Sequence, residues 1–107
     1  MDDIQIAPQE LKQKLDAGEK LLLVDVREPW ENQTCAIEDA KLVPLNSIPS
    51  NLAAFEGADQ IIVFCHHGGR SLNAAAFLRK QGKNGARSLT GGIDRWSVEI
   101  DPKIPRY

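Results

Sequence analysis

Two short aliphatic runs dominate the hydrophobic pattern of the chain. They cover residues 21–26 and residues 61–64, and neither shows the polar alternation of a half-exposed strand. This pattern is typical of strands that are buried on both faces of a parallel sheet. Residues 86–89 form a third, weaker run, and residues 4–6 and 40–43 favour further short strands. The chain is therefore predicted to build a sheet of several parallel strands.

Helical patterns alternate with these strands. The first predicted helix begins near Pro8 and stops at Gly18, the second covers residues 71–81, and a short third covers residues 91–99. Residues 44–50 contain two prolines and are predicted to form turns. Strands that alternate with helices imply right-handed crossovers. The fold class expected is α/β, a central and mostly parallel β-sheet flanked by helices on both faces.

Length and composition favour one compact domain. The chain has 107 residues, of which 42% are hydrophobic and 26% charged, as in ordinary globular domains. Its net charge of −2 argues against nucleic acid as a partner. The longest aliphatic run ends at Asp25, far short of a membrane span, and residues 1–3 show no start of a secretory signal. With only two cysteines, the protein is expected to be cytoplasmic and to bind no membrane.

The segment from Cys65 to Ser71 joins the strand at residues 61–64 to the following helix, and it carries the candidate chemistry. Ligands of open α/β sheets bind at such turns, at the carboxyl edge of the strands. Gly68 and Gly69 permit positive φ angles, which turn backbone N–H groups inward. We therefore expect an anion-holding nest at the start of a helix.

Cys65 is the candidate nucleophile of this turn. Helix N-termini and nearby cations lower the pKa of cysteine from about 8.5 to roughly 3.5–7.5, so we expect a thiolate at neutral pH. The thiolate is the nucleophilic form, and the same N–H groups would hold an anionic substrate. The alternative is that Cys65 is a small buried hydrophobic residue. A polar turn with two glycines and Arg70 seals a core poorly, which favours the reactive interpretation.

Charge is distributed unevenly around the turn. Residues 60–93 contain five cations and no carboxylate, and such a basic half would attract small anions. Arg79, Lys80 and Lys83 are explained by the solvated face and end of a helix. Arg70 lies inside the turn, and we expect it to bind an anion.

His66 and His67 follow the candidate nucleophile directly. Three consecutive side chains rarely converge on one ion, and no second Cys/His pair stands at a zinc-ligand spacing, so no metal is expected. One histidine is instead expected to donate to a bound anion or to the leaving group, while the other faces solvent.

Further motifs stand in order around the Cys65–Arg70 loop. They are the Asp-Val-Arg-Glu stretch within residues 23–31, the Ala…Val-Pro-Leu stretch at residues 40–45, and the Gly-Gly…Trp stretch at residues 90–96. Together with the loop, they resemble the rhodanese (thiosulfate sulfurtransferase) family. Residues 101–107 resemble the ending of one subgroup, whose members occur alone or fused behind adenylating enzymes.

The resemblance implies a single rhodanese-like domain over residues 1–107 that acts as a sulfurtransferase. Cys65 would attack the outer sulfur of a donor such as thiosulfate, expel sulfite and keep the sulfur as a persulfide. A thiol, a protein thiolate or cyanide would then remove it, with no cofactor beyond the covalent intermediate. The predicted partners are thus a small anionic sulfur donor and a thiol acceptor. The expected anion-binding residues around Cys65 are Arg70, His66, His67, Gly68, Gly69 and Ser71.

Two alternatives stay open beside the sulfurtransferase. The related cell-cycle tyrosine phosphatases and arsenate reductases use a Cys-x5-Arg loop that wraps a tetrahedral anion, whereas four residues separate Cys65 from Arg70. The resemblance assigns this smaller loop to sulfurtransferases. A non-catalytic or sulfur-carrier binding module is the other alternative, although such members usually lack the loop cysteine.

Residues outside the loop are expected to support it. Asp25 and Arg27 follow the first aliphatic run, so they are expected at the same sheet edge as Cys65, with Arg27 in an ion pair or network with Glu28. Cys35 is either a resolving thiol for Cys65 or an idle buried thiol, and the second is favoured.

One segment departs from the family pattern. Where the family has Gly-His-Ile-Pro-Gly-Ala, residues 35–40 read Cys-Ala-Ile-Glu-Asp-Ala. The segment lacks the glycine and the proline of the pattern, and it has no histidine to which the role of the family's histidine could be transferred. An altered turn geometry is therefore expected here.

Overall fold

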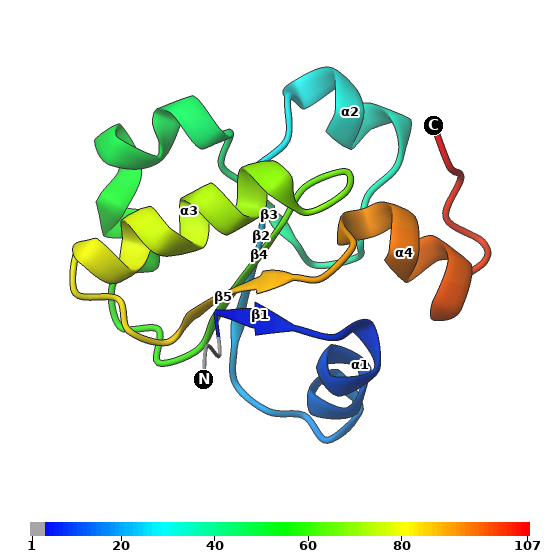
Figure 1. Cartoon of the computed structure of the whole chain (residues 1–107), viewed down its shortest axis with the longest axis horizontal. Coiled ribbons are helices and arrows are strands. Elements are labelled where there is room, and N and C mark those ends of the chain that lie inside the picture. Colours follow the sequence, from blue (N-terminus) through cyan, green and yellow to red (C-terminus); the bar gives the residue numbers. More distant parts are fainter. Residues whose placement is uncertain (1–3) are drawn as a thin grey trace.

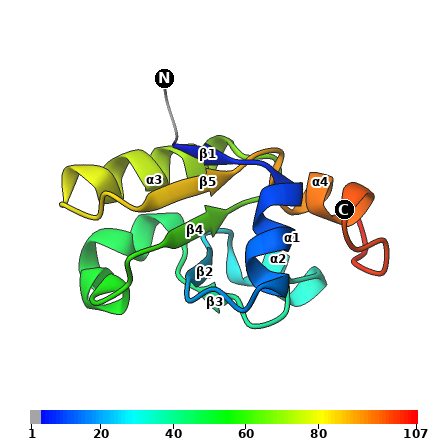
Figure 2. The ribbon, with the colours of Figure 1, turned by 90° about the horizontal axis from the view of Figure 1, so that it is seen from below.

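A sheet of five parallel strands forms the centre of the computed structural model, which describes residues 4–107 (Figure 1). The strand order is β1-β5-β4-β2-β3, as Figure 2 shows from top to bottom. The predicted parallel sheet is confirmed. Residues 1–3, which entered the expectation of no secretory signal, lie outside the described residues. The strands are β1 (Gln5–Ile6), β2 (Leu22–Asp25), β3 (Lys41–Leu42), β4 (Ile61–Phe64) and β5 (Ala86–Leu89).

Helices cover both faces of this sheet (Figure 1). One face carries α3 (Gly69–Lys80) and the 3₁₀ segment η1 (Leu45–Phe55), and the other carries α1 (Pro8–Asp16) and α4 (Gly92–Glu99). A fifth helical element, α2 (Pro29–Thr34), follows β2. The predicted helices are therefore all present, although α3 begins two residues earlier than expected.

The η1 segment corrects the prediction of turns at residues 44–50. It is a run of 3₁₀ turns that is interrupted at Asn51, where the backbone leaves helical angles. Ile48 and Phe55 are buried in the core, which holds the segment against the sheet although Pro49 has no N–H to donate. The prolines in this stretch favoured a prediction of turns, whereas packing of buried side chains stabilises the helical segment η1.

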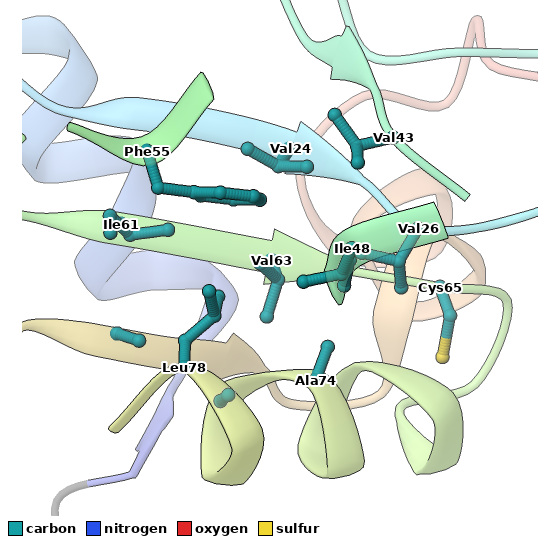
Figure 3. Packing of buried hydrophobic residues seen from close by; sticks show 12 residues of the cluster. Val24, Val26, Val43, Ile48, Phe55, Ile61, Val63, Cys65, Ala74 and Leu78 are labelled. Atoms are coloured by element: carbon teal, nitrogen blue, oxygen red, sulfur yellow. The ribbon is translucent and has the colours of Figure 1, made fainter. Parts of the chain in front are cut away.

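Alternation along the central strand divides the core into two clusters. Ile61, Val63 and Cys65 point to the face under α3 and η1, whereas Ile62 and Phe64 point to the face under α1 and α4. Figure 3 shows the first of these clusters. Every residue of β4 is fully buried, as expected for a central parallel strand. The end of this strand is therefore held rigidly from both sides.

The topology places the candidate site at the junction of β2 and β4. The chain leaves β2 toward β3 at one edge and leaves β4 toward β5 on the other side, so the connections diverge between the two strands. Ligands of open α/β sheets bind at such a switch point, outside the carboxyl ends of the strands. Asp25 pairs in register with Phe64, which brings the ends of β2 and β4 together. Within residues 4–107, no helix is long and apolar enough to cross a bilayer.

Candidate active site

Backbone amides converge on the sulfur of Cys65. The N–H of Gly68 donates to Sγ at 3.1 Å, and the N–H of Ser71 donates to it at 3.4 Å. Figure 3 shows this sulfur beside the first turn of the helix that carries Ala74. The Cys65 residue is only 1% exposed and belongs to the core cluster, yet its sulfur faces polar groups. The loop is therefore built to hold a partly or fully negative sulfur.

Gly68 alone supplies the positive φ angle of the predicted nest. Its φ is 115° and it is the N-cap of α3, whereas Gly69 is the first helical residue. The prediction that both glycines take positive φ is therefore wrong for Gly69. Arg70 consequently lies in the first turn of α3, so the connecting loop is shorter than the sequence pattern indicated.

The Ser71 hydroxyl connects the loop to the buried end of β5. Its Oγ lies 3.5 Å from Cys65 Sγ, donates to the Gly68 carbonyl at 3.2 Å and lies 2.7 Å from Ser88 Oγ of β5. Both serines are buried. Both the backbone N–H and the buried hydroxyl of Ser71 thus lie within hydrogen-bond distance of the Cys65 sulfur.

A second glycine pair supports the loop from the side of α4. The N–H of Ile93 donates to the Cys65 carbonyl at 2.8 Å, and the N–H of Asp94 donates to the His66 carbonyl at 3.1 Å. A Cβ on Gly92 would lie 2.4 Å from both carbonyl oxygens, and its φ is 63°. Only glycine allows this close approach. The sequence analysis treated this stretch only as a family motif, and its structural role needed the fold.

Arg70 binds the carboxylate of Glu31 in a bidentate pair. Nη1 lies 2.7 Å from Oε1 and Nη2 lies 2.9 Å from Oε2. Each terminal nitrogen carries two N–H groups, so each keeps one that is not used in this pair. The Arg70 side chain is 36% exposed, whereas that of Glu31 is 5% exposed. The guanidinium is therefore fixed in orientation and still accessible to a ligand.

Glu31 is one of the site residues that the sequence did not predict. Besides Arg70, its carboxylate accepts hydrogen bonds from the N–H of Glu28 at 2.9 Å and from the hydroxyl of Tyr107 at 2.8 Å. The Arg70 contact is the largest cause that lowers the pKa of Glu31 to about 2. Glu28 and Glu31 also form a capping box at the start of α2, and that spacing was the available signal.

Asp25 and Arg27 form a second ion pair, and it is fully buried. Arg27 Nη2 lies 2.7 Å from Asp25 Oδ2, and its Nε and backbone N–H donate to Oδ1. Arg27 also donates to the Cys35 carbonyl at 2.6 Å and to the Tyr107 hydroxyl at 2.9 Å. The predicted partner of Arg27, Glu28, instead caps α2. Asp25 and Arg27 thus support the site from the interior of the protein and do not face a ligand.

The two histidines lie in different surroundings. The His66 ring is stacked between the rings of His67 and Tyr107, with centroid distances of 3.9 and 4.0 Å. Burial, followed by the nearby His67, lowers the pKa of His66. The His67 side chain is 71% exposed, so His67 is the histidine that faces solvent. His66 Nε2 is buried and has no hydrogen-bond partner among residues 4–107.

Asp94 of α4 joins the two histidines and completes a group of three possible metal ligands. One ligand atom from each of the three residues lies within 4.8 Å of the others. The histidine rings are nearly parallel, at 17°, and Arg106 binds both oxygens of Asp94. Parallel rings do not aim their nitrogens at one point, and the carboxylate is already paired. We therefore assign no metal ligands to these residues.

The basic half of the sequence does not form a free positive surface. Arg70, Lys83 and Arg87 each pair with a carboxylate from outside residues 60–93. The fold thus brings acidic partners to three of the five cations, and these ion pairs weaken the long-range attraction of an anion. Attraction of an anion then depends chiefly on the loop itself.

Cys35 lies away from the Cys65 loop. Both cysteines are free and buried, but Cys35 packs in the cluster under α1 and α4, on the opposite face of the sheet from Cys65. Its neighbour is Arg27, whose Nη1 lies 3.8 Å from Sγ. This placement supports the interpretation of Cys35 as an idle buried thiol.

Comparison with known proteins identifies the class to which this fold and loop belong. The family model of the Rhodanese-like domain matches residues 7–99, and the chain belongs to this family. A protein named Sulfurtransferase from Allochromatium vinosum is 34% identical over 93 residues, which are 87% of each chain. The human single-domain sulfurtransferase TSTD1 superposes with a TM-score of 0.82 at 27% identity and covers 92% of this chain and 98% of its own.

Other relatives are much longer than this chain. The probable adenylyltransferase/sulfurtransferase MoeZ of Mycobacterium tuberculosis is 38% identical over 104 residues, which are 95% of this chain but 26% of that protein. The chain thus spans about a quarter of the length of such relatives.

Proposed function

We propose that this protein transfers a sulfane sulfur from a thiosulfate-like donor to a thiol through a persulfide on Cys65. In the first half-reaction, the Cys65 thiolate attacks the outer sulfur of thiosulfate. The sulfur–sulfur bond of the donor breaks, and its electron pair leaves with sulfite. In the second half-reaction, an acceptor thiolate attacks the outer sulfur of the persulfide, and the Cys65 thiolate is released. In each step one sulfur–sulfur bond forms as another breaks and the departing group takes the electron pair, so no external oxidant or reductant is required.

The observation that carries this proposal is the pair of N–H groups on the Cys65 sulfur. Donors from Gly68 and Ser71 stabilise negative charge on Sγ and on a sulfur attached to it. The free N–H groups of Arg70 suit the oxygens of thiosulfate or departing sulfite, because a planar guanidinium matches an oxyanion. The relatives named sulfurtransferases support the same chemistry.

A reducing compartment fits this proposal. Cys35 and Cys65 are both free thiols, and a persulfide cycle needs the thiolate to be regenerated in every turnover. We accordingly propose a cytoplasmic thiol or protein thiolate as the acceptor.

Steady-state kinetics test the proposal. Because the two half-reactions share no ternary complex, double-reciprocal plots for thiosulfate at several cyanide concentrations should be parallel. Cys65→Ser should reduce turnover to the uncatalysed rate, whereas the matched variant Cys35→Ala should retain it. Intersecting lines, or full turnover by Cys65→Ser, would refute the persulfide route.

A further inference from the structure

Tyr107 contacts both sides of the candidate site although it is the last residue of the sequence. Its hydroxyl donates to Glu31 Oε2 at 2.8 Å and accepts from Arg27 Nη1 at 2.9 Å. Its ring stacks on His66 at a centroid distance of 4.0 Å and an interplanar angle of 12°. It also meets the edge of Trp30 at 6.1 Å. One side chain therefore touches two charged pairs and the residue after the nucleophile.

We propose that Tyr107 is a positioning residue, which holds the Glu31–Arg70 pair and the His66 ring in place beside the Cys65 loop. The inference rests on the proposed sulfur transfer and adds residues 101–107 to the site that performs it. Tyr107 acts through Arg70 and His66.

The hydroxyl has only one hydrogen-bonding arrangement open to it. Arginine carries donors and no acceptor, so the oxygen of Tyr107 must accept from Arg27. Its single proton is then directed to Glu31. Burial is the main cause that raises the pKa of Tyr107 to about 12, so the proton is present at neutral pH. The position of the hydroxyl is itself fixed, because Arg27 is fully buried and bound to Asp25.

This hydroxyl completes the coordination of Glu31. Oε1 accepts from Arg70 and from the N–H of Glu28, and Oε2 accepts from Arg70 and from Tyr107. Each oxygen therefore has two donors, and the plane of the carboxylate is fixed. Since Arg70 binds that plane in a bidentate manner, the direction of its remaining N–H groups depends on Tyr107.

The ring of Tyr107 fixes His66 in the same way. His66 has His67 on one face and Tyr107 on the other, so its side chain cannot rotate without breaking one stack. The groups that act on its charge are His67, Asp94, Glu31 and Arg70. His66 directly follows Cys65 in the loop, so the two stacks also restrain the backbone next to the nucleophile.

Residues 101–107 are attached to α4 in a way that delivers Tyr107 to this position. Ile104 is buried in the core cluster under α4, and its carbonyl accepts from the Ser97 hydroxyl. Arg106 binds Asp94 of α4 in a bidentate pair. Ile104 and Arg106 therefore anchor the chain to α4 just before Tyr107, whose ring reaches the site.

Two substitutions separate the hydroxyl from the ring. Tyr107→Phe keeps the stack and removes both hydrogen bonds, and Tyr107→Leu removes both features. Lys103→Ala is the matched control, because its side chain is exposed on the same segment. For Tyr107→Phe we expect KM for thiosulfate to rise about tenfold with kcat within about twofold, since a hydrogen bond to a charged group is lost. Lys103→Ala should leave both constants unchanged.

NMR of the two histidines supplies a readout that does not depend on activity. A ring stacked at 4.0 Å shifts the His66 ring-proton resonances, so Tyr107→Leu should move them, whereas Tyr107→Phe should leave them close to their wild-type positions. A general loss of folding would instead collapse the resonances of both histidines and lower the apparent kcat with KM unchanged, because only the folded fraction is active.

The outcomes separate this inference from the proposed function. If wild-type protein turns over thiosulfate and both Tyr107 variants keep its KM, the positioning role is wrong. If wild-type protein takes no sulfur from thiosulfate, the proposed function fails, and the histidine spectra alone then decide. Unchanged His66 resonances in Tyr107→Leu would overturn the positioning role in either case.

Discussion

Two arginine–carboxylate pairs lie side by side at this site, and they differ in their access to solvent. Asp25 and Arg27 are both fully buried, and they come from the last residue of β2 and from two positions after it. Arg70 and Glu31 come from α3 and α2, and the guanidinium of Arg70 is 36% exposed. The Tyr107 hydroxyl touches one member of each pair.

The comparison shows how one type of contact serves two purposes. We call the buried Asp25–Arg27 pair the closed pair. The donors of Arg27 are directed at Asp25, at the carbonyl and sulfur of Cys35, and at Tyr107, which leaves no N–H group for a ligand. We call the Glu31–Arg70 pair the open pair. The Glu31 carboxylate orients the guanidinium of Arg70, and each terminal nitrogen of Arg70 keeps one N–H group for a ligand. Changes in the closed pair should therefore alter stability, and changes in the open pair should alter the binding of anions.

The largest expected effect is that of Arg27→Met. The substitution leaves the Asp25 carboxylate buried without its cation, and breaking a buried pair in this way costs about 3–5 kcal/mol of unfolding free energy. Urea denaturation measures the loss. The double variant Asp25→Leu, Arg27→Met should be more stable than the single variant, because no buried charge remains. A single variant as stable as the wild type would show that the closed pair has no structural role.

Acid should weaken the open pair over a defined pH range. The pKa of Glu31 is lowered from 4.5 to about 2, chiefly by Arg70. A carboxyl whose pKa is lowered by folding stabilises the folded state above its unfolded value, and this contribution disappears as the pH falls. Because the Arg70 side chain is 36% exposed and solvent screens the pair, we expect a loss of only about 1–2 kcal/mol of unfolding free energy between pH 4.5 and 2.

The matched variant for this pH dependence is Glu31→Gln. It cannot ionise, so its stability should change less than that of the wild type across the same range. Denaturation curves at pH 5, 4, 3 and 2 give the two slopes, and equal slopes would contradict the assignment of this titration to Glu31.

Removal of the open arginine should change binding more than stability. Arg70→Ala should raise KM for thiosulfate about tenfold, which corresponds to roughly 1.4 kcal/mol. The unfolding free energy should fall by only about 1 kcal/mol, because water reaches the vacated side of Glu31. Arg70→Lys should recover part of the affinity, since it restores the charge but not the planar fork. An unchanged KM with a collapsed melting temperature would place Arg70 with the closed pair.

The smallest expected effect comes from the edge of the closed pair. Asn32 donates to Asp25 Oδ2 at 3.1 Å from a half-buried position. Asn32→Ala should lower the unfolding free energy by about 1 kcal/mol and leave KM for thiosulfate unchanged. A change in KM comparable to that of Arg70→Ala would mean that the two pairs are not functionally separate.

Local patterns predicted the strands and the nucleophilic loop. The aliphatic run at residues 61–64 and the glycines after it are features of neighbouring residues, so periodicity and backbone preference were enough to place Cys65. The family resemblance added the type of reaction. Both depend on short stretches of sequence.

The remaining parts of the site depend on contacts between distant segments. The loop is contacted by Glu31 of α2, by Gly92 of α4 and by Tyr107 at the end of the sequence. No local sequence pattern predicts that these residues lie close together. The ion pairs of the basic half could not be predicted for the same reason, because their carboxylates, Glu56 and Glu10, come from other parts of the chain.

The altered segment at residues 35–40 shows a different limit. Asp39 stands where the family pattern has glycine, and it takes a φ of 70° itself. Aspartate tolerates this left-handed region better than most residues. Asp39 therefore takes a positive φ without being glycine, which composition alone did not predict.

Intact-protein mass spectrometry after incubation with thiosulfate tests the central claim most directly. Wild-type protein and Cys35→Ala should each gain the mass of one sulfur atom, cyanide should remove it, and Cys65→Ser should gain none. Equal uptake of sulfur by Cys65→Ser, or none by the wild type, would contradict the account.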